Sequence, residues 1–185
     1  MVFSMEKRYI PLLIILGLLI VIIITPIVAA IFDIPVIALD TPDISIASFD
    51  YWSIGHFLWG VSLFVLAFTF GWIIKNLTGV PKDPINEPEF KSFVLYWIII
   101  VIIAGLWEII ENTILYIVGI KVELDSAANI ITDITIWGIG GCVSWYMTDL
   151  MFLSDKYLRA YYIYGIMCLI MGVLIFVVFG FITTS

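Results

Sequence analysis

The stretch that decides the fold class is IPLLIILGLLIVIIITPIVAAIF, residues 10–32, in which no residue is charged. A helix needs about 20 consecutive apolar residues to cross the hydrocarbon core of a membrane. Four further apolar runs follow, at residues 51–74, 92–119, 126–146 and 161–183. The sequence therefore predicts an all-α integral membrane bundle of five transmembrane helices, with residues 1–185 forming a single transmembrane domain.

The composition excludes several classes of protein. The chain is 63% hydrophobic and 12% charged, whereas about 25% of the residues of a soluble domain are charged. Its net charge of −7 offers no basic face for a nucleic acid. The apolar stretch before Ala30 is longer than the roughly 7–15 residues of a signal peptide's hydrophobic region, so we expect an uncleaved first helix.

The basic residues indicate which way the helices run. With the N-terminus in the cytoplasm, the cytoplasmic segments hold Lys7, Arg8, Lys75, Lys82, Lys91, Lys156 and Arg159. The outer segments then hold only Lys121. Because cytoplasmic loops carry an excess of Lys and Arg, we expect a multi-pass protein of the plasma membrane, surrounded by membrane lipids, with its N-terminus inside and its C-terminus outside.

Seven polar side chains in or beside the second, third and fourth runs are candidates for a functional site. They are His56, Glu108, Glu111, Asn112, Asp125, Asn129 and Asp133. An ionisable residue inside a span costs about 2.5–3.5 kcal/mol and is a functional hypothesis by default. A short outer connection makes the third and fourth helices antiparallel neighbours, and Glu111 and Asp133 lie at similar depths. We expect these two side chains to face each other, with His56 close by.

The charge of this set restricts its chemistry. It holds four carboxyl groups and no Lys or Arg within the spans, and like charges in a low-dielectric setting cannot all stay ionised. Protons, a bound cation or a water-filled cavity are the three alternatives. Oxygen ligands with one imidazole suit a divalent metal ion, whereas protonated carboxyl groups bonded to Asn112 and Asn129 need no cofactor. The metal ligands would be His56, Glu108, Glu111 and Asp133.

Each polar residue also has a structural interpretation. Asp125 can cap the fourth helix, with Ser126, and Asn129 can join two helices by a hydrogen bond. His56 alone can be a satisfied histidine just below the membrane surface. The loop of residues 33–50 carries four aspartates and no basic residue, and we expect a solvated connector there. Convergence of the whole set at one depth favours a functional site.

Three segments carry a resemblance to a known group of membrane proteins. They are YWSIGHFLWG at residues 51–60, WEIIEN at residues 107–112 and DSAANIITD at residues 125–133, followed by Gly138, Gly140 and Gly141. In their order and spacing these segments resemble the VanZ-like and YjdF-like multi-spanning proteins and a related uncharacterised bacterial inner-membrane family. The resemblance covers about residues 50–142. It implies a role in the cell envelope or with lipids, and the glycines provide small surfaces for close helix packing.

Three classes of function stay open. The first is a hydrolase or transferase acting on a lipid-linked substrate, in which a divalent metal assists and Glu111, His56 and Asp133 do the chemistry. The residues that bind would be Glu108, Asn112, Asn129 and Asp125. The second is a non-enzymatic accessory protein that holds a cation or lipid head group, as a homo-oligomer or with a membrane partner protein. The third, a proton or cation pathway, is disfavoured because we find no polar residues that continue into the inner leaflet beyond Thr135 and Ser144.

Overall fold

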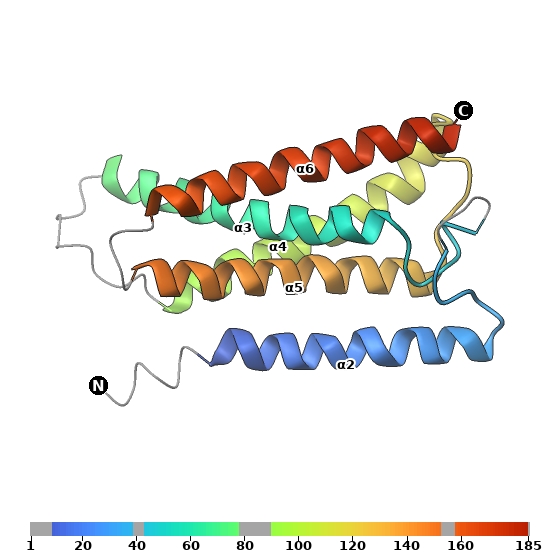
Figure 1. The fold of residues 1–185 in the computed structure, drawn as a ribbon, viewed down its shortest axis with the longest axis horizontal. Coiled ribbons are helices and arrows are strands. Elements are labelled where there is room, and N and C mark those ends of the chain that lie inside the picture. The colour runs from blue at the N-terminus through green and yellow to red at the C-terminus, as the bar shows by residue number, and fades with distance from the viewer. Residues whose placement is uncertain (1–8, 39–42, 78–89, 153–157, 185) are drawn as a thin grey trace.

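A computed structural model of the protein describes residues 9–38, 43–77, 90–152 and 158–184, and this part of the chain contains five α-helices and no strand (Figure 1). The helices are α2 (Ile10–Ile31), α3 (Trp52–Leu77), α4 (Phe90–Ile110), α5 (Ala127–Phe152) and α6 (Leu158–Thr184). A short π-helical segment, η1 (Glu111–Leu115), continues α4. The predicted all-α class is confirmed, and each apolar run of the sequence overlaps one of these helices, the third run also covering η1.

Among the residues that the structure describes, three helical stretches are long and apolar enough to cross a membrane. They are Ile10–Ile31, Trp52–Gly71 and Phe93–Leu115, and a shorter apolar stretch covers Ile163–Val178 of α6. Helix α2 exposes apolar side chains over most of its surface, including Leu13 and Ile27, at 64% and 59%. Because large exposed apolar surfaces are rare on soluble monomers, these helices indicate a membrane protein.

The helix directions bring the polar segments to one end of the bundle. Consecutive helices run in opposite directions, so the starts of α3 and α5 lie at the same end as the end of α4 (Figure 1). Helix α5 lies against α2, α3 and α4, and α3 also packs on α6. The polar residues near the start of α3, the end of α4 and the start of α5 are therefore neighbours.

Two glycines allow α3 and α5 to touch through their backbones. A Cβ atom on Gly60 would lie 2.2 Å from the carbonyl oxygen of Trp137, and one on Gly140 would lie 2.3 Å from that of Phe57. No side chain fits at such distances, so a larger residue at either position would push the helices apart. The expected role of Gly140 in close helix packing is confirmed. This contact holds His56 on α3 against the first half of α5.

The π-helical segment η1 changes the direction of the side chains at the end of α4. The side-chain amide of Asn112 donates to the carbonyl of Glu108 at 3.0 Å, and the hydroxyl of Thr113 donates to the carbonyl of Ile109. Such bonds to carbonyls one turn back compete with the main-chain ladder of a helix. The wider turn rotates Glu111 and Asn112 away from a simple α-helical register, and π segments of this kind are frequent at functional sites.

Candidate functional site

His56 is the centre of the polar cluster and is 2% exposed. Its Nδ1 atom accepts a hydrogen bond of 2.6 Å from Nε1 of Trp137, and its Nε2 atom lies 3.4 Å from Oδ2 of Asp133. In a neutral imidazole one nitrogen accepts and the other carries the hydrogen. Because the indole can only donate, the neutral ring must carry its hydrogen on Nε2, facing Asp133.

Asp133 belongs to a chain of hydrogen bonds that reaches the loop before α3. The hydroxyl of Ser53 donates to Oδ1 of Asp133 at 3.2 Å. Asp50 and Ser53 cap the start of α3 reciprocally: the amide of Ser53 donates to the Asp50 carboxylate at 3.0 Å, and the amide of Asp50 donates to the Ser53 hydroxyl at 3.3 Å. This arrangement is a variant of the capping box. The start of α3 is thus fixed to the carboxylate that faces His56.

Asn129 ties the same loop to α5. Its side-chain amide donates to the carbonyl of Ala47 at 3.0 Å and lies 3.5 Å from Oδ2 of Asp50. Asp50 is buried, at 8% exposure. Burial raises the pKa of Asp50 to about 6, although hydrogen bonds from Ser53, Trp52 and Asn129 oppose the shift. The expectation that residues 33–50 form a solvated connector is therefore wrong for the end of this loop, which closes over the cluster.

The two glutamates approach His56 from the end of α4. His56, Glu108 and Glu111 each offer one ligand atom, and these atoms lie within 4.8 Å of one another. Glu108 is 4% exposed, and none of the described residues donates a hydrogen bond to its Oε2 atom. His56 thus has Asp133 on one side and both glutamates within a short distance. This placement matches the expected grouping of Glu111, Asp133 and His56.

Lys121, which lies outside the predicted spans, contributes a positive charge to the cluster. Its ammonium group lies 3.0 Å from Oε1 of Glu111 and also bonds Oδ2 of Asp125. Burial lowers the pKa of Lys121, but the charges of Glu111 and Asp125 outweigh that effect, so the pKa is raised and the side chain stays charged. The sequence predicted carboxyl groups with no permanent basic partner, and this is wrong for Glu111 and Asp125, which Lys121 reaches from the connection between η1 and α5.

Asp125 lies at the edge of the cluster, in the connection just before α5, and its side chain bonds to Asn112 and Lys121. It shares two hydrogen bonds of 2.8 Å with Asn112: the Asn112 side-chain amide donates to Oδ2 of Asp125, and the backbone amide of Asp125 donates to Oδ1 of Asn112. The hydroxyl of Ser126 caps α5 by accepting from the amide of Asn129 at 3.1 Å. The suggestion that Asp125 caps this helix is wrong, since only Ser126 does so. Asp125 instead joins the ends of the two helices through Asn112 and Lys121.

Comparisons with protein-family models, with curated proteins and with solved structures give no match. The chemistry of the site must therefore be judged from its geometry. Counting the described residues, the cluster holds five carboxyl groups and one lysine: Asp50, Glu108, Glu111, Asp125, Asp133 and Lys121. One ammonium group cannot neutralise five carboxylates, so protons, a further cation or a water-filled cavity must still compensate the remaining charge.

Four participants were not among the candidates named from the sequence: Asp50, Ser53, Lys121 and Trp137. Asp50 and Ser53 are spaced as an N-terminal cap, and that spacing could have placed them beside the site. Lys121 lies in the irregular connection between η1 and α5, where no helical spacing rule pairs it with Asp125 or Glu111. Trp137 lies one helical turn after Asp133, yet no sequence pattern distinguishes a tryptophan that donates to a histidine from one that only packs.

Proposed function

We propose that the protein is a multi-pass protein of the plasma membrane in which all five helices cross the bilayer, with the N-terminus in the cytoplasm and the C-terminus outside. The alternating helix directions (Figure 1) and the seven-to-one distribution of basic residues support this topology. In this orientation the polar cluster lies in the outer half of the membrane. It would therefore meet ligands from the outer leaflet or from outside the cell.

In this role the polar cluster binds a divalent cation. The observation that carries it is the grouping of ligand atoms from His56, Glu108 and Glu111 within 4.8 Å. Ligand distances of about 2.0–2.6 Å place the atoms around one ion at separations of this order. The Glu108 oxygen without a hydrogen-bond donor is a natural ligand. The excess of carboxyl groups supplies the electrostatic attraction.

The hydrogen bond from Trp137 restricts how His56 takes part. Coordination through Nε2 needs a free lone pair there, which moves the hydrogen to Nδ1, where the Trp137 N–H now points. Two donors cannot face each other at 2.6 Å. His56 therefore either stays a hydrogen-bond donor beside ions held by the glutamates, or becomes a ligand after Trp137 moves.

The reaction we favour is hydrolysis of, or transfer from, a lipid-linked substrate of the cell envelope, as the resemblance to VanZ-like and YjdF-like proteins implies. A bound divalent cation supplies polarisation of a phosphoryl or carbonyl oxygen. Glu111, with 22% of its side chain exposed, is the carboxylate that a substrate can reach and is placed to act as general base. Asp133 and Trp137 orient His56, whose Nε2–H can donate a hydrogen bond to a substrate oxygen that gains negative charge.

A non-enzymatic role as a cation- or lipid-binding accessory protein is the second candidate. The ion pair between Lys121 and Glu111 favours it, because a neighbouring ammonium stabilises the carboxylate and weakens it as a base. The two roles differ in what Glu111 does. In an enzyme, Glu111→Gln abolishes turnover and leaves substrate bound, whereas in a binding protein the same change alters retention of the ligand alone.

Elemental analysis of the purified protein, together with identification of co-purified lipids, tests the proposal. We expect about one equivalent of a divalent metal, lost on treatment with EDTA and reduced in Glu108→Gln and Glu111→Gln. Loss of the metal should also lower the thermal midpoint by linkage. Glu123→Gln is the matched control, because Glu123 is an exposed acid in the same connection as Lys121.

Absence of metal from the protein, with no stabilisation by added Mn²⁺, Zn²⁺ or Mg²⁺, would reject cation binding. Infrared spectroscopy then distinguishes the remaining arrangements. A protonated carboxyl band near neutral pH that disappears in the glutamine variants would mean that protons neutralise the cluster. The lack of both metal and protonated carboxyl would leave a hydrated binding surface and would remove the catalytic role.

A further inference from the structure

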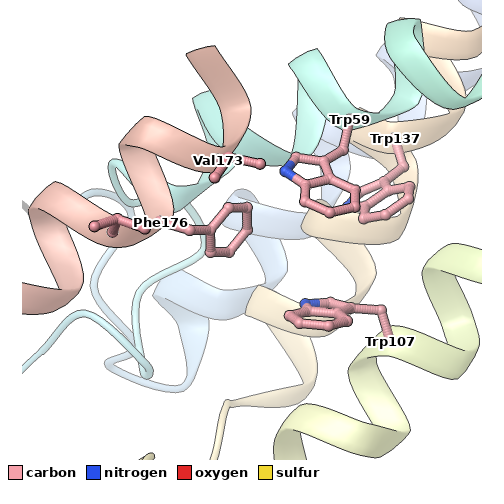
Figure 2. Close-up of a pocket in the computed structure, with 6 residues that line it drawn as sticks. Trp59, Trp107, Trp137, Val173 and Phe176 are labelled. Atoms are coloured by element: carbon pink, nitrogen blue, oxygen red, sulfur yellow. The ribbon is translucent and has the colours of Figure 1, made fainter. Parts of the chain in front are cut away.

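A second feature of the bundle is an apolar cavity with aromatic walls beside the polar cluster. It has a volume of about 150 Å³ and is lined by Trp59, Trp107, Trp137, Val173, Phe176 and Val177. Figure 2 shows the rings of the three tryptophans and Phe176 around a common space between α3, α4, α5 and α6. Apolar cavities of about this size bind molecules as large as benzene.

The rings present faces to this cavity from several directions. Trp59 and Trp107 are nearly parallel, at 21°, with ring centroids 6.3 Å apart. Phe176 stands at 88° to Trp59 and 74° to Trp107, with centroids about 6 Å from each. Gly172 leaves room for the indole of Trp59, because a Cβ atom at this position would lie 2.7 Å from that ring. We call the rings of Trp59, Trp107, Trp137 and Phe176, which border one space, the aromatic cage.

The cage and the polar cluster share a wall. Trp137 lines the cage and donates to His56, and the ring of His56 lies 5.4 Å from that of Phe176. Trp107 directly precedes the buried Glu108. The polar cluster behind this wall holds more carboxyl groups than ammonium groups, and each carboxylate that stays ionised favours a positively charged occupant over a neutral one.

The chemistry of the walls specifies which kind of cation fits. A primary ammonium group has three N–H donors that need acceptors, and the residues that line the cage are all apolar or aromatic. A quaternary ammonium group has no N–H, carries a spread positive charge, and is attracted by the faces of tryptophan rings within about 6 Å. We propose that this cage binds a quaternary ammonium group, whether carried by a lipid head group or by a free small molecule.

Binding of choline by the purified protein, kept in a detergent without a choline head group, tests this inference. The matched probe is neohexyl alcohol, which has the shape of choline but no charge. We expect choline and tetramethylammonium to bind at least roughly tenfold more tightly than neohexyl alcohol, measured by calorimetry and tryptophan fluorescence, because the cation–π attraction is strongest in a desolvated cage.

Substitutions in the cage assign the effect to its rings. Trp59→Leu and Trp107→Leu should each lower choline affinity roughly tenfold while leaving the affinity for neohexyl alcohol nearly unchanged. Trp97→Phe is the control, because Trp97 is outside the cage and donates to the carbonyl of Gly138 at 2.9 Å. Circular dichroism and the thermal midpoint establish that each variant is folded. Equal affinity for the charged and uncharged probes would overturn the inference and identify a simple apolar cavity.

Two further measurements separate the sources of the ligand and the two sites. Short-chain phosphatidylcholine that binds more tightly than choline, with phosphatidylglycerol of the same chains showing no binding, identifies a lipid head group. Choline alone binding as well as the lipid identifies a free ligand. The experiments are repeated with EDTA and in Glu111→Gln: binding that persists there supports the cage even if the metal proposal fails. No binding of any quaternary ammonium probe rejects the cage.

Discussion

Replacing Lys121 by methionine removes the ammonium group that contacts both Glu111 and Asp125. The three side chains are 11%, 22% and 5% exposed respectively, so the ion pairs are largely withdrawn from water. Removing one partner of a buried ion pair costs about 3–5 kcal/mol, because the other charge is left uncompensated. Since Glu111 keeps some solvent contact, we expect a loss at the lower end, about 3 kcal/mol.

The assay is unfolding of the purified, metal-free protein in detergent, with Glu123→Gln as a control that should not change stability. Adding Glu111→Gln to the Lys121→Met variant should recover part of the loss, because it removes one unpaired carboxylate. Millimolar Mn²⁺ should also recover it, since a bound cation replaces the ammonium charge. A Lys121→Met variant as stable as the wild type would refute the electrostatic reasoning, because the carboxylates would then not depend on this partner.

Three further outcomes follow from the same structure. Burial raises the pKa of the Asp50 carboxyl to about 6 from an ordinary 3.8, so its stabilisation of the folded state is complete below about pH 4 and is lost as the pH rises through about 6. Between pH 4 and pH 7.5 the free energy of unfolding of Asp50→Asn should therefore rise by up to about 3 kcal/mol relative to that of the wild type. Parallel pH profiles of stability for the two proteins would contradict this. Trp137→Phe should raise affinity for Mn²⁺ roughly tenfold if His56 is a ligand, because the opposing N–H is gone, whereas unchanged affinity would leave His56 outside the coordination shell. Reporters fused after Lys82 should be cytoplasmic and those after Ser185 extracytoplasmic, and a cytoplasmic C-terminus would reject the five-span topology.

The helices and the meeting of the polar residues could be predicted because each depends on a strong local pattern. Long apolar runs specify membrane-length helices, and short connections make consecutive helices antiparallel. These two rules are enough to place His56, Glu111 and Asp133 at one end of the bundle. The close contact of Gly140 with α3 also followed, since small residues allow helix backbones to approach.

The remaining parts of the site depend on contacts that no local pattern specifies. Lys121 was assigned to an outer connection, but its long side chain reaches back to Glu111 in η1 and is largely withdrawn from water. Asp50 was assigned to a solvated loop, yet it is buried and bonds to Ser53 and Asn129. The π-helical turn at Glu111 also rotates side chains in a way that a regular i, i+4 pattern does not predict.

Trp137 connects the two sites that we propose. Its indole N–H occupies the lone pair of His56 Nδ1, and its ring forms one wall of the aromatic cage. Coordination of a metal by His56 requires this hydrogen bond to break, and a displaced indole changes the shape of the cage. A quaternary ammonium ligand that holds the ring in place should therefore weaken metal binding through His56. By linkage, the metal should weaken ammonium binding by the same factor. Equal choline affinity with and without a bound metal would mean that the ion is held by Glu108 and Glu111 while the bond from Trp137 to His56 stays intact.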